Sequence, residues 1–223
     1  MAGCCSPGGY DDVFGEKQAR KDLRRYLRHG LNRDARGALG FLRSRGIQGA
    51  SVLEVGGGVG AFQLELLRAG AARTVDVELS RAYEGAAGEL LAGSGFEDRV
   101  ERRLGDVVEE PPEPEDAVAL IRVVCCYPDP ERLVGTAAER ARRLLVLTYP
   151  PDDALARAVI ATLNFFHRLS GTEFRAFAHP HERIHAAAER HGLRLVHRER
   201  GAIWHVAGFE RVGVPEQPGT MGT

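Results

Sequence analysis

The stretch "SVLEVGGGVGAF", residues 51–62, decides the fold class of this chain. An apolar run over residues 51–55 leads directly into residues 56–60, where four of the five positions are glycine. Glycine lacks a Cβ atom and adopts positive φ angles at little cost, so such a segment lets the backbone approach a ligand closely. A strand that ends in glycines and continues as a helix predicts a nucleotide-binding loop, but the glycines alone do not decide which nucleotide binds.

Strand-like and helical segments alternate after this loop, which predicts an α/β fold with a parallel sheet and helices on both faces. Two helices are expected before the first strand, over 16–29 and 33–45, each stopped by a glycine. The expected strands are 51–55, 73–77, 99–104, 117–124 and 143–149, with helices between them near 60–69, 80–93 and 130–141.

The last third of the chain has a different pattern. A long amphipathic segment, 153–169, precedes a helix near 181–191. Two strand-like runs, 193–199 and 202–210, are joined through Gly201, and so short a link predicts that they pair antiparallel. The expected organisation is an N-terminal helical lid over 1–46, a core over 47–212 and a disordered tail over 213–223.

The composition indicates a single soluble domain, with 43% hydrophobic residues and a net charge of −1 in 223 residues. The arginines are interleaved with acids, so we expect neither a nucleic-acid partner nor a membrane partner. The chain has no long apolar run and no leader pattern, which predicts a cytoplasmic protein. We expect a monomer or a homodimer, with the pairs Cys4-Cys5 and Cys125-Cys126 reduced.

Three carboxylates bear on which nucleotide binds. Glu54 lies within an otherwise apolar strand, where a carboxylate needs a partner, and the α-amino group of S-adenosylmethionine would supply one. Glu78 comes where the next strand ends and could accept two hydrogen bonds from a ribose diol. Asp106 follows the third strand, where a short carboxylate could accept from an adenine amino group. Asp76 competes with Glu78 for the ribose, and Asp106 could merely cap a helix.

On these residues, with "DAVALIRVVCCYPD" at 116–129, the sequence resembles the class I S-adenosylmethionine-dependent methyltransferases. The resemblance implies a Rossmann-like seven-stranded sheet, mostly parallel, with a C-terminal antiparallel hairpin, and in-line methyl transfer to a small molecule. It favours Glu78 over Asp76 for the ribose. The implied cofactor-binding residues are Glu54, Gly56, Gly58, Gly60, Glu78, Leu79, Asp106, Val107 and Val123.

The downstream sequence more weakly resembles the magnesium-protoporphyrin IX O-methyltransferase branch, through the Tyr-Pro after the fourth strand and the late His179. The chain departs from that branch at Cys126, where a histidine is expected, and at Phe14, where a tyrosine is expected. We therefore carry over a mobile lid and leave the acceptor open, with transfer to a carboxylate or hydroxyl oxygen expected. The catalytic candidates are His179, Tyr127 and Cys126, and the substrate-binding candidates are Tyr10, Phe14, Tyr127 and His167.

Three alternatives stay open. His181, Glu182 and His185 form the zinc-protease pattern, but Ala188 replaces the glycine of the extended motif, so the helix should continue and carry His191 away from a metal; we expect no metal. A fold that binds the cofactor without catalysis is the second. The third is a soft-metal or arsenic site, if Cys4-Cys5 approach Cys125-Cys126.

Overall fold

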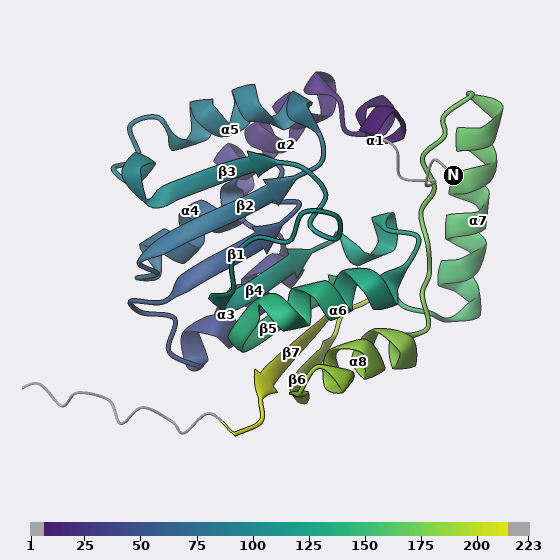
Figure 1. The fold of residues 1–223 in the computed structure, drawn as a ribbon. Helices are drawn as coiled ribbons and strands as arrows, with labels where there is room; N and C mark the ends of the chain where they lie inside the picture. The colour runs from purple at the N-terminus through teal and green to yellow at the C-terminus, as the bar shows by residue number, and fades with distance from the viewer. Residues whose placement is uncertain (1–6, 214–223) are drawn as a thin grey trace, which may run out of the picture.

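The strands form one seven-stranded sheet in the computed structural model, which describes residues 7–213 (Figure 1). Its order is β3-β2-β1-β4-β5-β7-β6; the first five strands run parallel, and β7 is antiparallel to both β5 and β6. The predicted α/β fold with its C-terminal antiparallel hairpin is therefore confirmed. The strands are β1 (Ser51–Val55), β2 (Arg73–Glu78), β3 (Val100–Leu104), β4 (Glu115–Ile121), β5 (Ala141–Tyr149), β6 (Leu193–Arg200) and β7 (His205–Arg211).

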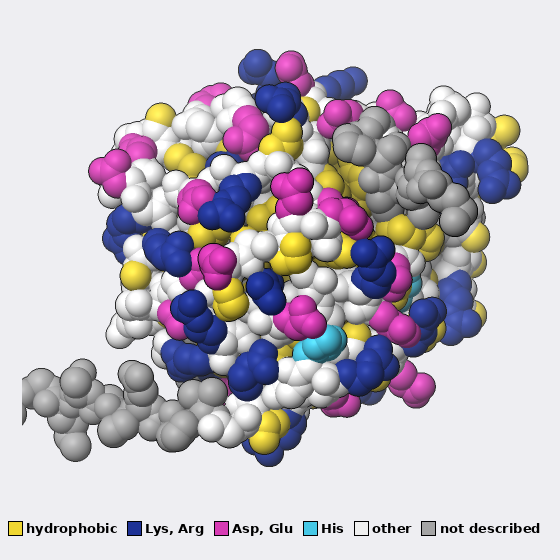
Figure 2. All heavy atoms as spheres, in the orientation of Figure 1, with side chains coloured by type: hydrophobic (Ala, Val, Ile, Leu, Met, Phe, Trp, Pro, Cys, Tyr) yellow, Lys and Arg dark blue, Asp and Glu magenta, His cyan; other side chains and the backbone are white. Residues whose placement is uncertain are grey.

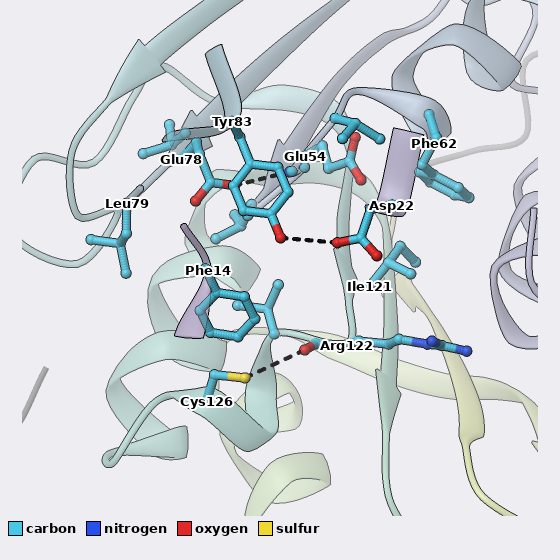
Figure 3. Close-up of a pocket in the computed structure, with 18 of the residues that line it drawn as sticks. Phe14, Asp22, Glu54, Phe62, Glu78, Leu79, Tyr83, Ile121, Arg122 and Cys126 are labelled. Carbon is cyan, nitrogen blue, oxygen red and sulfur yellow. Dashed lines mark hydrogen bonds between the residues drawn. The ribbon is translucent and has the colours of Figure 1, made fainter. Parts of the chain in front are cut away.

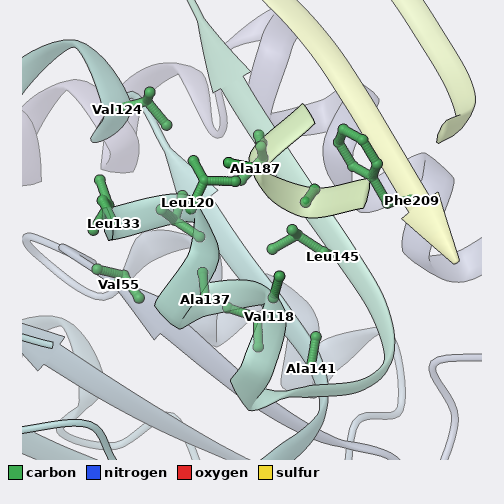
Figure 4. Close-up of a cluster of buried hydrophobic side chains, with 14 of the residues drawn as sticks. Val55, Val118, Leu120, Val124, Leu133, Ala137, Ala141, Leu145, Ala187 and Phe209 are labelled. Atoms are coloured by element: carbon green, nitrogen blue, oxygen red, sulfur yellow. The ribbon is translucent and has the colours of Figure 1, made fainter. Parts of the chain in front are cut away.

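Alternation along the central strand β4 creates two cores. Val118 and Leu120 point to one face, where they join a cluster built with α6 and α8 (Figure 4). Ala117 and Ala119 point to the other face and pack with side chains of α3 and α4. The helices are α1 (Pro7–Val13), α2 (Glu16–His29), α3 (Arg33–Ser44), α4 (Ala61–Arg68), α5 (Glu84–Leu91), α6 (Pro130–Arg140), α7 (Ala154–Leu169) and α8 (His181–Arg190).

The sheet places a ligand crevice at the carboxyl ends of its parallel strands. The chain turns from β1 toward β2 on one side and reaches β4 on the other, so strand order reverses between β1 and β4. In open α/β sheets, ligands bind at such a reversal point, outside the carboxyl ends of the strands. The glycine segment 56–60 begins at this point, directly after β1.

The fourth strand is shorter than expected. It was predicted over 117–124 but ends at Ile121, because Arg122 takes a left-handed conformation with φ 64° and donates its backbone N–H to Thr148 Oγ1 at 2.7 Å. Residues 124–126 then form a 3-10 turn. The apolar run "VVCC" at 123–126 therefore leaves the sheet and lies over its carboxyl edge.

Two other predicted elements differ from the structure, and one helix lacks a prediction. The helix expected over 80–93 is a 3-10 turn, 81–83, followed by α5. The strand expected from residue 202 begins at His205, because residues 201–204 form a turn in which Gly201 donates its N–H to the Trp204 carbonyl oxygen at 3.1 Å. Helix α1 was not predicted, since its sequence, PGGYDDV, carries two glycines and a proline.

The N-terminal helices close one end of the crevice. Tyr10 of α1 donates its hydroxyl hydrogen to the Cys126 carbonyl oxygen at 2.6 Å, and Ser80 donates to Asp11 at 2.6 Å. Tyr83 donates to Asp22 of α2 at 3.0 Å. The expected lid position is thus occupied by α1 and α2, held to the core by hydrogen bonds.

The surface shows two further features. On the face drawn in Figure 2, Lys and Arg side chains are intermixed with Asp and Glu side chains. Helix α7 stands beside the sheet (Figure 1) and has no buried residue, although it is long and amphipathic. No helix within residues 7–213 is long and apolar enough to cross a membrane. The tail expected over 213–223 lies outside the described residues, except for Gly213.

Gly208 of β7 lies where a side chain would collide with the core, because a Cβ atom there would come within 2.6 Å of the Phe41 ring of α3. We expect Gly208→Ala to destabilise the protein by about 1–3 kcal/mol through overpacking, measured by thermal or urea unfolding. The matched control is Gly88→Ala in α5, where a Cβ atom meets nothing within 4 Å. This control should be neutral or stabilising by about 0.5–1 kcal/mol; equal stabilities for the two variants would contradict the packing of β7 on α3.

Candidate cofactor and acceptor site

A cavity of about 270 Å³ lies where the carboxyl ends of β1, β2 and β4 and the loop after β3 meet the lid (Figure 3). This volume is near the lower end of the ~300–1,000 Å³ range of small-molecule sites. The lining combines the glycine segment, the end of β2, the turn after β3, the end of β4, and residues of α1, α2 and the α2–α3 link. All nine predicted cofactor-binding residues except Gly60 line it: Glu54, Gly56, Gly58, Glu78, Leu79, Asp106, Val107 and Val123.

The glycine segment requires glycine at positions where both conformation and space exclude a side chain. Gly56 has φ 67°, and a Cβ atom there would lie 2.8 Å from Val123 Cγ2. Gly58 has φ 55° and faces the Tyr83 ring. Gly60, which does not line the cavity, takes φ 76° as the N-cap of α4. The segment is therefore a tight turn that brings backbone to the cavity wall.

Two carboxylates at the end of β2 hold this turn. Gly57 donates its N–H to Asp76 Oδ1 and Gly58 donates to Glu78 Oε2, each at 2.9 Å. Ser80 donates its N–H to the other Glu78 oxygen at 2.9 Å. Glu78 lines the cavity and Asp76 does not, so the geometry favours Glu78 over Asp76 as a ligand-binding carboxylate. A carboxylate has about four acceptor positions, which leaves Glu78 capacity for a diol.

Glu54 is a buried carboxylate with an unsatisfied oxygen. Its Oε2 atom has no hydrogen-bond partner among residues 7–213, and only 2% of the residue is exposed. Burial, and then the negative charge of Asp76, raise the pKa of Glu54 well above its ordinary value. Glu54 lines the cavity, so an ammonium group bound there would satisfy the oxygen and favour the ionised form.

Arg102 of β3 balances these acids, and the sequence analysis did not identify it. Glu54 pairs in register with Asp76, and Asp76 with Arg102, so the three side chains form a row across β1, β2 and β3. Arg102 lies 2.8 Å from Asp76 and donates to the Gly58 carbonyl oxygen at 2.9 Å. Burial nevertheless raises the pKa of Asp76 to about 7. The sequence pattern "RVERRL" predicts a strand with solvent-exposed side chains. Only the register of β3 on β2 brings Arg102 to the site.

Asp106 caps a turn and lies at the cavity wall. Its Oδ1 atom accepts from the Val108 N–H at 2.9 Å, which caps the turn after β3. Its Oδ2 atom accepts from the Tyr127 hydroxyl at 3.1 Å, and both residues line the cavity. Asp106 therefore caps the turn after β3, and its carboxylate lies at the cavity wall.

The lid contributes an aromatic cluster to the cavity. Tyr10 and Phe14 line it, and both rings contact Phe174, at centroid distances of 5.7 and 5.3 Å. His167 of α7 lies behind this cluster, 5.7 Å from the Phe174 ring, and does not line the cavity. Of the lid and α7 residues predicted to bind substrate, the structure brings Tyr10 and Phe14 to the cavity and leaves His167 outside it.

Two of the three catalytic candidates, Cys126 and Tyr127, line the cavity. Cys125 and Cys126 have their sulfur atoms 3.7 Å apart, whereas Cys4 and Cys5, proposed as their partners, lie outside the described residues. His179 does not line the cavity: its Nε2 atom lies 2.9 Å from the Tyr127 carbonyl oxygen. A carbonyl oxygen only accepts, so Nε2 carries the proton and the ring supports the Tyr127 backbone. This geometry does not favour His179 as a catalytic base.

Arg122, which the sequence analysis also missed, is the one non-glycine residue within 7–213 with positive φ. Such a conformation costs about 1–3 kcal/mol and often marks functional sites. Arg122 lines the cavity and makes two hydrogen bonds with Asp34 of α3, at 2.8 and 2.6 Å. The sequence feature that could have indicated Arg122 is a single arginine among apolar residues at the end of a strand.

The zinc-protease pattern on α8 faces the core rather than the cavity. His181 Nε2 lies 3.0 Å from the Pro150 carbonyl oxygen, and His185 Nε2 lies 2.5 Å from the Tyr149 hydroxyl. Glu182 is exposed. Among residues 7–213, no group of three or more His, Cys, Asp or Glu side chains is placed to hold a metal ion. The two histidines hydrogen-bond to β5 and the residue after it, which does not favour zinc hydrolysis.

Comparison with known proteins identifies the fold. No protein-family model and no curated protein sequence matches the chain. Magnesium protoporphyrin IX methyltransferase from Synechocystis PCC 6803, solved with bound SAH, has a TM-score of 0.69 and 19% identity, over 90% of this chain and 97% of that chain. An O-methyltransferase family 2 protein from Planctomyces limnophilus, solved with apigenin, has a TM-score of 0.64 and 22% identity, over 88% and 62%.

The cyclase SpnF also shares the fold, with a TM-score of 0.61 and 14% identity, over 79% of this chain and 80% of that chain. The chain therefore has the fold of the S-adenosylmethionine-dependent methyltransferases, as the sequence predicted. A cyclase with the same fold shows that the fold alone does not fix the reaction.

The unsatisfied oxygen of Glu54 makes a stability prediction for the cofactor-free protein. Because the folded pKa of Glu54 is raised, its contribution to stability is greatest below the ordinary pKa and is lost as pH rises toward the raised value. Glutamine does not titrate, so Glu54→Gln should raise the free energy of unfolding by about 1 kcal/mol relative to wild type, seen as a higher Tm. This difference between the variant and wild type should grow as pH increases from 6 to 8. The control is Glu101→Gln on the exposed part of β3; a pH-independent difference would contradict this account.

Proposed function

We propose that this protein is a methyltransferase that uses S-adenosylmethionine and transfers the methyl group to an oxygen atom of a small molecule. The observation that carries the proposal is the buried Glu54 carboxylate, which lines the cavity with one oxygen unpaired among the described residues. An α-ammonium group is the partner that this oxygen lacks. A dinucleotide shares the ribose diol but has no such amine.

The other cavity residues fit the rest of the cofactor. Glu78 would bind the ribose diol with its remaining acceptor positions, and Leu79 and Val107 would pack against the adenine ring. Asp106 would accept from the adenine amino group. The methyltransferase fold and the neighbours crystallised with SAH or apigenin support this assignment.

Methyl transfer places few demands on the side chains. S-adenosylmethionine supplies a methyl group that is already activated, so the protein's main contributions are to orient the acceptor and to exclude water. Tyr10 and Phe14 of the lid, with Cys126 and Tyr127 of the β4 turn, enclose the cavity for this purpose. A carboxylate acceptor is ionised at neutral pH and needs no base, which agrees with the absence of histidine from the cavity lining within 7–213.

Binding of the cofactor is tested by calorimetric titration with S-adenosylhomocysteine beside NADH. We expect selective binding of S-adenosylhomocysteine, weakened about tenfold or more in Glu54→Gln and in Glu78→Gln because each loses a charge-assisted hydrogen bond, and unchanged in Glu101→Gln. In wild type the affinity should rise with pH, since the Glu54 carboxyl must lose its proton to pair with an ammonium; Glu54→Gln should lose this pH dependence. Selective binding of NADH would refute the assignment.

Catalysis is tested with methyl-labelled S-adenosylmethionine and a panel of small carboxylates and phenols, with amines as the contrast. We expect label to enter the carboxylates or phenols and to form base-labile esters in the first case. Tight cofactor binding with no transfer to any acceptor, even in a single turnover, would instead favour the non-catalytic alternative. Labelled amines alone would contradict transfer to oxygen.

A further inference from the structure

We propose that the Arg122 guanidinium anchors an anionic group, a carboxylate in chemical class, that the methyl acceptor carries apart from the atom that is methylated. The inference rests on the proposed function and specifies its substrate class. It is built on three properties of Arg122: how its side chain is fixed, which of its donors remain, and which charges share its end of the cavity.

The guanidinium is fixed on one edge and one face. Its Nε and Nη2 atoms donate to the two oxygens of Asp34, which is itself only 6% exposed. Its carbon lies 4.9 Å from the centre of the Trp204 ring, which covers one face. A guanidinium held in this way loses little conformational entropy when it binds a further group.

The end of the guanidinium keeps donors for a ligand. Arginine has five N–H donors, and two are used by Asp34, so three on Nη1 and Nη2 make no hydrogen bond to any residue within 7–213. The side chain is 34% exposed and lines the cavity, whose lining also includes Asn32, the residue before α3, and Ala35, which follows Asp34. The Arg122 side chain runs away from Cys126, with the guanidinium at its far end (Figure 3). The two nitrogens at this end match the two oxygens of a carboxylate.

Charges divide the cavity into two ends. Three of its carboxylates, Glu54, Glu78 and Asp106, belong to the glycine-loop end assigned to the cofactor. The cations that line the cavity, Arg25 of α2 and Arg122, lie with the residues of the lid and the α2–α3 link. Asp22, the remaining carboxylate, accepts the Tyr83 hydroxyl hydrogen. Asp22 and Asp34 offset these two cations, so the lid end is close to neutral, whereas Glu78 and Asp106 make the glycine-loop end negative. An acceptor with an anionic end would therefore be repelled less at the lid end than at the cofactor end.

A carboxylate held by Arg122 would be a poor methyl acceptor, because the hydrogen bonds stabilise the lone pairs that must attack. The anchored group is therefore distinct from the reacting oxygen. A purely structural role for Arg122, linking α3 to the turn 201–204, would not require three unused donors. The Asp34 and Trp204 contacts instead orient the free end of the guanidinium.

The test compares two isosteric probes, 1-naphthoate and 1-naphthamide, which differ in charge. Their affinities are measured by calorimetry, with and without S-adenosylhomocysteine. Because Arg122→Gln alone would leave Asp34 buried and unpaired, the main variant is Arg122→Gln with Asp34→Asn. Arg122→Lys keeps a charge for Asp34 but lacks the planar pair of nitrogens that would bind a second carboxylate. The control is Arg24→Gln, which removes an exposed charge of α2 that does not line the cavity.

We expect wild type and Arg24→Gln to prefer 1-naphthoate about tenfold or more, the range of a charge-assisted hydrogen-bonded pair. The double variant and Arg122→Lys should lose this preference while binding S-adenosylhomocysteine as wild type does. Arg25→Gln, which removes the other cation that lines the cavity, is measured in parallel. The assignment would be overturned if the two probes bound equally or if 1-naphthoate failed to bind. It would also be overturned if the preference survived in the double variant or was lost only in Arg25→Gln. Absence of S-adenosylhomocysteine binding would refute the proposed function, while the probe preference would still test Arg122.

Discussion

A row of three buried ionisable side chains across the sheet underlies the whole site. Glu54, Asp76 and Arg102 are register partners on β1, β2 and β3, so two carboxylates lie side by side with one guanidinium to balance them. Asp76 accepts a hydrogen bond from the Gly57 N–H and so holds the glycine turn. Glu54 is left with an unpaired oxygen among the described residues and with a raised pKa, so a cationic ligand group would pair with this oxygen and favour the ionised carboxylate.

The other half of the cavity depends on how β4 ends. The left-handed conformation of Arg122 ends β4 at Ile121 and turns the following 3-10 segment across the sheet edge, where Tyr10 of the lid hydrogen-bonds to it. One backbone feature thus positions Cys126 and Tyr127 at the cavity and directs the Arg122 side chain toward Asp34. The strain is offset by that ion pair and by the bond to Thr148.

Local sequence patterns predicted correctly which glycines and strand-end acids lie at the cavity. They did not predict the roles of the histidines, because those roles depend on the residues packed around each ring. The glycine segment and the strand-end acids lie at the cavity because the parallel strands end at one edge. The His-Glu-x-x-His pattern has the helical spacing of a metal site, yet its histidines hydrogen-bond to Tyr149 and Pro150. His179 likewise supports a backbone carbonyl. A histidine's role depends on what lies opposite each ring nitrogen, and sequence spacing does not contain that information.

The sequence by itself determined the order of strands and helices, the antiparallel closing hairpin and the glycine turn, because these follow from periodicity and from the conformational freedom of single residues. Only the tertiary structure decided which charges meet. Arg102 reaches Asp76 through strand register, and Arg122 reaches Asp34 across 88 positions of the chain. Long-range pairings of this kind depend on the packing of α3 against the sheet and on the register of β3, so no local pattern near either residue records them.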